Sequence, residues 1–330
     1  MSQSKEFEKL KQSSWFPFSD EPVIKGLWYV PRLSCISFLF PEESVDQKWH
    51  LFAHSWLGIQ HYNSDSGIMW EPVQMVQIRG KHPFLFKDKN QYHLIYERHG
   101  SLIPFVERLS KKSKKEHIKE SHIEMRSSND LNVWSEPKVL FKATDALCAS
   151  DYLKKPLIGH PQLIKVDGGY RLYFGTSKVG FNPSSARYIC SAFSKNIDGP
   201  YQLESEVPIL EANPNSKYSN LAVGRLSIYK ENQDYLGFQN GRYWDDDKKK
   251  ESSAITIVSS SDGLNFSECD VKPVLTPVEN TWASKHIVSC DVRYKKDEDC
   301  WYCYYSATGQ RKGLLVKESI GLMIGKFVRK

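Results

Sequence analysis

The residues best suited to chemistry in this 330-residue sequence are histidines and arginines that begin short runs rich in apolar and aromatic residues. His82 and His160 each precede a proline at the start of such a run, and Arg32, Arg225 and Asp291 begin three similar runs. Arginine binds phosphate or carboxylate in a bidentate manner, and histidine exchanges protons near neutral pH. If these residues meet, they predict an electropositive site for a small anionic or strongly polar ligand.

A second group of candidates follows the runs that come next in the chain. Glu97 and Arg98 end one of them, Arg242 and Trp244 another, and Trp56 a third, directly after His54 and Ser55. We expect general acid–base catalysis from His160 and His82 together with Asp291 or Glu97. The substrate-binding residues predicted with them are Arg32, Arg225, Arg98, Arg242, Trp56 and Trp244.

Each candidate also has a structural interpretation. The His-Pro pairs could be a hydrogen-bonding device at the start of a strand, and Arg32 and Arg225 could pair with Asp291 or Glu97. A tryptophan in a β-rich chain often packs in a core instead of stacking on a sugar. Two histidines and a carboxylate could also ligate a metal, but the sequence has no local metal-binding motif. We therefore predict no metal and no cofactor.

The elements that must position these residues are β-hairpins. Residues 159–177 contain an apolar run, the turn Asp167-Gly168-Gly169 and an alternating aromatic run, which is a strong hairpin signal. Similar pairs of runs recur along the chain, at residues 32–55, 80–96, 225–239 and 291–306. Repetition at this spacing is typical of propellers and arrays.

Four of the hairpins are followed by a polar turn and one aromatic anchor, which are Trp70, Trp134, Tyr201 and Phe266. This order fits the outer strands of a four-stranded blade. We predict an all-β, five-bladed β-propeller with four antiparallel strands per blade. Its active-site face lies at the central channel, where first strands begin and second strands end. The whole chain, 1–330, is one domain, with 1–27 as an N-terminal extension. An irregular β-sandwich is the alternative.

Composition limits the class of protein. The net charge of +6 lies largely in mixed clusters such as residues 111–119 and 245–250, so we predict no nucleic-acid face. The mean hydropathy of −0.51 and the charged N-terminus favour neither a membrane protein nor a signal peptide. The seven scattered cysteines indicate reduced thiols, and Cys300 and Cys303 should face opposite sides of a strand. We therefore expect a cytoplasmic protein without a membrane partner.

The phrases HPFLFKDKNQYHLIYE, GHPQLIKVDGGYRLYFGTS and SSDGLNF resemble blade starts and ends of the five-bladed propeller glycosidases of families 43, 32, 68 and 117. The resemblance implies hydrolysis or transfer of furanosyl or xylosyl units by two carboxylates and a glutamic acid near the channel. This chain departs from that pattern, with His82-Pro83 in place of Asp-Pro and Gly159-His160-Pro161 in place of Glu-Gly-Pro. Arg32 and the following residues replace the first aspartate. A histidine acid resembles that of family 117.

The function that we predict is a glycosidase-like enzyme that acts on a small, anionic glycoside or sugar derivative by general acid–base catalysis in the central pocket. Glycoside cleavage needs a proton donor and an anionic partner, which the histidines and the remaining carboxylates would supply. Two alternatives stay open. One is an inactive propeller that binds carbohydrate or an anion, and the other is a propeller recruited to lyase- or cyclase-type chemistry of a small metabolite.

Overall fold

The computed structural model describes residues 5–27, 32–98, 121–145, 157–177, 188–309 and 317–327. These residues form five antiparallel sheets, four of them with four strands and one with five. The sheets are the blades of a five-bladed β-propeller, so the predicted fold class is confirmed and the β-sandwich alternative is not. The basic run at residues 111–119 lies outside the described residues.

The protein divides into two compact units. Unit 1 comprises Met1–Ile36, Arg187–Ile189 and Ile209–Lys330, and unit 2 comprises Ser37–Ala186 and Cys190–Pro208. The single domain that we expected stays a prediction, and the two units have their own apolar clusters.

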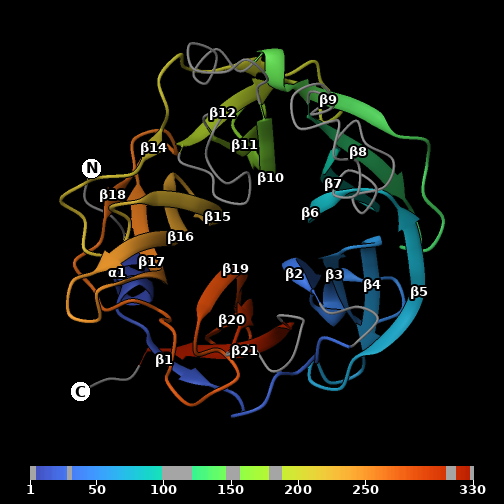
Figure 1. Cartoon of the computed structure of the whole chain (residues 1–330). Helices are drawn as coiled ribbons and strands as arrows, with labels where there is room; N and C mark the ends of the chain where they lie inside the picture. Colours follow the sequence, from blue (N-terminus) through green and yellow to red (C-terminus); the bar gives the residue numbers. More distant parts are fainter. Residues whose placement is uncertain are drawn as a thin grey trace, which may run out of the picture. The chain divides into compact units, whose positions relative to one another are not determined.

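Unit 2 contains three sheets, although the first residues of β2 and β12 and the whole of β14 belong to unit 1 (Figure 1). The first sheet has β2 (Ser34–Leu39), β3 (Trp49–Ser55), β4 (Gly58–Ser64) and β5 (Glu71–Ile78), with the 3-10 turn Pro41–Glu43 between β2 and β3. The second has β6 (Lys81–Asp88), β7 (Gln91–Arg98), β8 (His122–Ser128) and β9 (Lys138–Lys142), followed by the 3-10 turn Ala143–Asp145. The third has β10 (Leu157–Val166), β11 (Gly169–Ser177), β12 (Tyr188–Ser194), β13 (Gln202–Leu203) and β14 (Leu210–Glu211), which also pairs with β12.

The tight turns that the sequence predicts are present in unit 2. β10 and β11 are joined by Asp167 and Gly168, and Gly168 has a φ of +80°. Lys89 takes the same left-handed conformation, with a φ of +53°, in the turn between β6 and β7. Positive φ at such positions matches the twist of the paired strands, which is why glycine and polar residues are found there.

Apolar side chains on both faces of the sheets hold unit 2 together. One cluster includes Ile95 of β7 and Leu163 of β10, and the anchor Tyr201 packs in it. Another cluster includes Phe52 and Tyr96, with Trp134 packed against it. The anchors at the ends of the second and third hairpin units thus fill space beside the sheets, as predicted from their position.

Unit 1 contains the other two sheets (Figure 1). One has β15 (Ala222–Glu231), β16 (Asp234–Asp245), β17 (Lys250–Ser260) and β18 (Ser267–Glu268). The other has β19 (His286–Lys295), β20 (Cys300–Thr308), β21 (Glu318–Lys326) and, as its outermost strand, β1 (Ser14–Pro17). The helix α1 (Lys5–Lys11) precedes β1.

The N-terminal residues are part of the packing of unit 1. Strand β1 pairs antiparallel with β21, and Phe7 of α1 is fully buried in an apolar cluster of this unit. The centre of the cluster is Trp301, whose ring lies 5.1 Å from Phe238 and 5.0 Å from Tyr229 between ring centroids. Residues that we expected to form an extension therefore supply a strand and core side chains.

The cysteines partly contradict the prediction of reduced thiols. Five have free thiols, namely Cys35, Cys269, Cys290, Cys300 and Cys303. Cys190, however, takes part in a disulfide bond. Burial and the nearby charge of Glu298 raise the pKa of Cys300 to about 11, so this thiol is a poor nucleophile.

In the part of the protein that the structure describes, no helix has the length and apolar character needed to span a membrane.

Candidate active site

His82 and His160 occupy matching irregularities in two sheets of unit 2. The register of β6 against β7 shifts between Lys81 and Phe84, and that of β10 against β11 shifts between Gly159 and Gln162. Both histidines have a left-handed backbone, with φ of +52° and +51°. Such a conformation costs a non-glycine residue on the order of 1–3 kcal/mol and is concentrated at functional sites. The bulges re-aim both side chains away from the regular alternation of their strands.

These side chains meet in one group, the histidine cluster, which consists of His54, His82, Glu97 and His160. A short hydrogen bond joins Nδ1 of His82 to Oε2 of Glu97. The ring of His160 is stacked on that of His82, with centroids 3.7 Å apart and planes inclined by 17°. His54 packs edge-on against His82 at 5.5 Å between centroids. Strands β3, β6, β7 and β10 each supply one member.

The carboxylate fixes the protonation pattern of His82. When Glu97 is ionised, its carboxylate only accepts hydrogen bonds, and Nδ1 of His82 then carries the proton that is donated to it. Nε2 is then the basic nitrogen of the ring, as in the histidine of a catalytic triad, whose carboxylate orients the imidazole. The side chains of His82 and Glu97 are 13% and 6% exposed. The pair is therefore shielded, but solvent still reaches the imidazole.

Gly159 is a residue of this site that we did not single out from the sequence. A Cβ atom at this position would lie 2.2 Å from Oε2 of Glu97 and 3.1 Å from Nδ1 of His82. Glycine therefore lets the backbone of β10 approach the carboxylate. The available signal was a glycine within a predicted strand, which often marks such a close approach.

A second polar network holds the strand that carries Glu97. The hydroxyl of Tyr96 donates to Oε2 of Glu124 at 2.7 Å, and Nε2 of His122 lies 2.8 Å from Oε1 of the same carboxylate. Burial favours the neutral form of Glu124, but the bonds from His122 and Tyr96 outweigh it and hold its pKa below the ordinary value. A charged, fully bonded carboxylate of this kind fixes β7 against β8.

The other predicted residues of unit 2 lie at strand ends. Arg98 is half-buried, and its Nη1 donates to the carbonyl oxygen of Arg79. Trp56 is in the turn between β3 and β4 and is 38% exposed. It is therefore not a core tryptophan, and its predicted stacking on a sugar stays a prediction.

Arg225 and Asp291 of unit 1 lie inside their strands, which corrects our prediction that they begin them. β15 starts at Ala222 and β19 at His286. The register of β15 shifts between Val223 and Leu226, around Arg225, and that of β19 shifts between Ile287 and Ser289, before Asp291. Arg225 is buried, and its Nη1 donates to the carbonyl oxygen of Ile36 at 2.6 Å. Buried Asp291 accepts a hydrogen bond from Ser227 Oγ at 3.2 Å and lies 3.4 Å from Nε of Arg293.

The remaining candidates of unit 1 are more exposed. Arg32 is exposed and precedes β2 instead of beginning a strand. Arg242 forms an ion pair with Glu251 across β16 and β17. Trp244 is 46% exposed, and its backbone N–H donates to Oδ1 of Asn220 at 2.9 Å. The roles of these residues in binding stay predictions.

The histidine cluster offers only part of a metal-binding set. Within unit 2, the ring nitrogens of His54 and His82 lie within 4.8 Å of each other. Two imidazoles supply half of the four ligands of a typical zinc site. These two residues alone do not define a metal site, and the absence of a metal and of a cofactor stays a prediction.

Comparison with known proteins gives no match to a family model and no match among curated proteins. Solved structures do match. One of them is described as a BT0996 RGII complex. It is similar to this protein over 97% of this protein and 94% of its own length, with 11% identity and a TM-score of 0.64. An α-L-arabinofuranosidase from Lactobacillus brevis is similar over 92% of each of the two proteins, with 8% identity and a TM-score of 0.59.

A thermostable family-43 glycoside hydrolase is also similar, over 90% of this protein and 89% of its own length, with 13% identity and a TM-score of 0.60. These neighbours bear out the resemblance seen in the hairpin phrases. The low identities agree with the departures noted at the catalytic carboxylates. The protein thus has the five-bladed propeller fold of the family-43 glycoside hydrolases, in a strongly divergent form.

Proposed function

We propose that the protein is a glycosidase-like enzyme that acts on a small sugar derivative, with the histidine cluster as its acid–base centre. The observation that carries this proposal is the hydrogen bond between His82 and Glu97 beneath the stacked ring of His160. The glycoside hydrolases among its structural neighbours support a sugar-derived substrate. We infer that this substrate is anionic from the arginine and histidine residues that the sequence offers as candidates.

The proton chemistry follows from the geometry. Glu97 holds the proton of His82 on Nδ1, so Nε2 takes a proton from an attacking water or from the substrate. The two rings are 3.7 Å apart, and two unit charges at this distance repel by about 4 kcal/mol at an effective dielectric constant of 20. A proton on one ring therefore disfavours a proton on the other, which suits one ring as base and the other as acid.

Hydrolysis of the glycosidic bond needs one proton donor and one proton acceptor. The acid gives its proton to the leaving oxygen as the C–O bond breaks, the base accepts a proton from water, and the water oxygen forms the new bond to carbon. Glu97 stabilises the imidazolium that forms on His82, since its carboxylate remains hydrogen-bonded to Nδ1.

One observation favours a second candidate function of the lyase type. Inverting glycosidases keep their two catalytic groups about 6.5–9.5 Å apart and retaining ones about 5–5.5 Å apart, on both sides of the scissile bond. The stacked histidines are 3.7 Å apart between centroids, so they form a single proton-transfer centre. A single centre suits elimination, in which one group removes a proton next to the bond and returns it to the leaving oxygen without water.

Turnover of a panel of aryl furanosides, uronides and sugar phosphates tests both functions, with product masses measured. Hydrolysis adds the mass of one water across the products, whereas elimination does not. The variants His82→Ala, His160→Ala and Glu97→Gln should lose at least about 100-fold in kcat. His93→Gln is the matched control, because His93 is a buried histidine of β7 that bonds Ser127 instead. Saturable binding of a sugar without turnover by the native protein would instead support an inactive binding module.

A further inference from the structure

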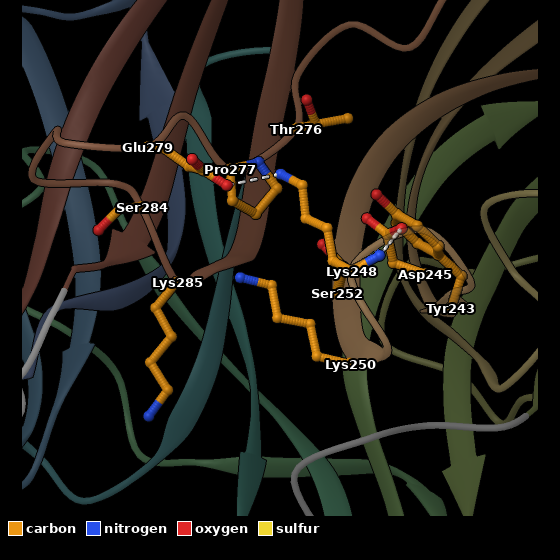
Figure 2. A pocket seen from close by; sticks show the side chains of 10 residues that line it. All are labelled: Tyr243, Asp245, Lys248, Lys250, Ser252, Thr276, Pro277, Glu279, Ser284 and Lys285. Carbon is orange, nitrogen blue, oxygen red and sulfur yellow. Dashed lines mark hydrogen bonds and ion pairs between the residues drawn. The ribbon is translucent and has the colours of Figure 1, made fainter.

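A pocket in unit 1 lies between the β16–β17 hairpin and the segment that leads into β19 (Figure 2). None of its lining residues belongs to the histidine cluster. Figure 2 shows Lys248 and Lys250 extending from the hairpin side, with Lys285 on the opposite side. Pro277 and Glu279 lie across from the hairpin.

The two acidic residues at this pocket already have partners. Glu279 forms an ion pair with Lys248 at 3.0 Å. Asp245 accepts the backbone N–H groups of Asp247 and Lys248, both at 3.1 Å, in the hairpin turn. Neither Lys250 nor Lys285 has a carboxylate within ion-pair distance among the residues that the structure describes. Three lysine charges thus face two carboxylate charges at this pocket, which leaves one positive charge in excess.

The imidazole of His286 lies in the positive electrostatic field of these lysines. His286 directly follows Lys285, and its pKa is lowered by burial first and then by the charges of Arg242, Lys285 and Lys250. The negative charge of a bound anion would offset these positive charges and so raise the pKa of His286. Basic residues around a concave surface concentrate anions in this manner.

Hydroxyl groups complete the lining. Ser252, Thr276 and Ser284 all border the pocket, and Ser252 of β17 is buried. Each hydroxyl can donate one hydrogen bond, and each lysine ammonium up to three. Several donors around a net positive charge match the oxygen atoms of a tetrahedral oxyanion.

We propose that this pocket binds a phosphate or sulfate group carried by a small molecule. Lys250 and Lys285 supply the charge, and the hydroxyls of Ser252, Thr276 and Ser284 orient the oxygens. Lys248 remains paired with Glu279 and fixes the hairpin against the loop. The site binds the anion and takes no part in proton transfer, so it is independent of the function proposed above.

Titration calorimetry at constant ionic strength tests this site directly. The probes are inorganic phosphate, inorganic sulfate and ribose 5-phosphate, with chloride as the reference anion. We expect saturable binding at one site, weakened at least tenfold in the double variant Lys250→Gln/Lys285→Gln. Lys272→Gln is the matched control, because Lys272 is an exposed lysine of the same unit outside the pocket, and it should bind as the native protein does.

The relative affinities distinguish a phosphorylated ligand from a sulfated one. Tighter binding of ribose 5-phosphate than of sulfate identifies a phosphorylated ligand, and the reverse order identifies a sulfated one. Equal affinity in the native protein and the double variant, or displacement by chloride at equal ionic strength, overturns the site. Thermal unfolding of each variant confirms that it is folded, and because no turnover is measured, the result does not depend on the histidine cluster.

Discussion

At the scale of single residues, the candidate chemistry depends on one carboxylate and one glycine. Glu97 sets which nitrogen of His82 carries the proton, and Gly159 leaves the space in which the carboxylate lies. Neither role follows from the residue type alone. Both depend on a bulge that brings a side chain of β6 and the backbone of β10 to the same carboxylate.

Glu97→Gln should remove the negative charge that stabilises a protonated His82 while keeping the size of the side chain. We expect kcat to fall by about 100-fold or more, with a smaller change in KM, because the charge matters most when the imidazolium forms. The measurement is steady-state kinetics on a substrate found in the panel. An unchanged kcat would contradict the assigned role of Glu97.

Gly159→Ala should disturb the site through a steric clash. The new Cβ would lie 2.2 Å from Glu97 Oε2, so the carboxylate must move away from His82. We expect lost activity and a free energy of unfolding lowered by about 1–3 kcal/mol.

The matched control for this change is Gly168→Ala at the turn after β10, where a Cβ meets nothing within 4 Å. This change costs only the strain of a φ of +80°, on the order of 1 kcal/mol, and leaves activity intact. Equal activity of the two variants would show that Gly159 has no special place in the site.

At the scale of elements, the first blade of unit 2 contains a row of hydrogen-bonded polar groups in which the two histidines, His50 and His61, are buried. Nδ1 of His50 lies 2.8 Å from Nε2 of His61, and Nε2 of His50 lies 2.8 Å from Oδ1 of Asp46. His61 is stacked on Phe52 with ring centroids 4.2 Å apart. Burial and the neighbouring His50 lower the pKa of His61 to about 3, so the folded protein holds this ring neutral.

This polar network should make the blade sensitive to acid. The pKa of His61 is depressed in the folded state, so the unfolded protein takes up its proton first as the pH falls below about 6.5. Stability is then lost between about pH 6.5 and pH 3, with a slope of up to about 1.4 kcal/mol per pH unit. Urea unfolding at several pH values from 7.5 to 4 should show a shallower slope in His61→Gln. Parallel curves for the two proteins would count against this source of acid sensitivity.

At the scale of the whole molecule, strands from both ends of the described sequence meet in one sheet of unit 1. β1 completes the sheet of β19, β20 and β21, and α1 adds Phe7 to the cluster around Trp301. Unit 2 has apolar clusters of its own, between its sheets. The N-terminal residues therefore contribute to the stability of unit 1.

A pair of phenylalanine variants measures this contribution. Phe7 is fully buried, whereas Phe16 of β1 is 51% exposed. Phe7→Ala should lower the free energy of unfolding by about 3–5 kcal/mol through the cavity that it leaves. Phe16→Ala should change it by less than about 1 kcal/mol. Similar losses in urea unfolding for the two variants would show that α1 is not part of the core.

Much of the fold follows from local patterns. Turns such as Asp167-Gly168, the alternating aromatic runs and the anchors Trp134 and Tyr201 predict hairpins and outer strands, because turn geometry and side-chain alternation are properties of neighbouring residues. Strand starts were harder to predict, as β15 and β19 show. A bulge shifts the register without leaving a clear mark in the sequence.

The sequence by itself determined the repeated blade, the hairpin turns and the two His-Pro pairs as candidates for chemistry. Only the tertiary structure decided that Glu97 bonds His82, that His160 stacks on it, that Gly159 must be small, and that Arg225 and Asp291 are buried among backbone and side-chain partners. The physical reason is that these contacts join residues far apart in the sequence. Their geometry depends on the register and packing of whole sheets, which no short stretch of sequence specifies.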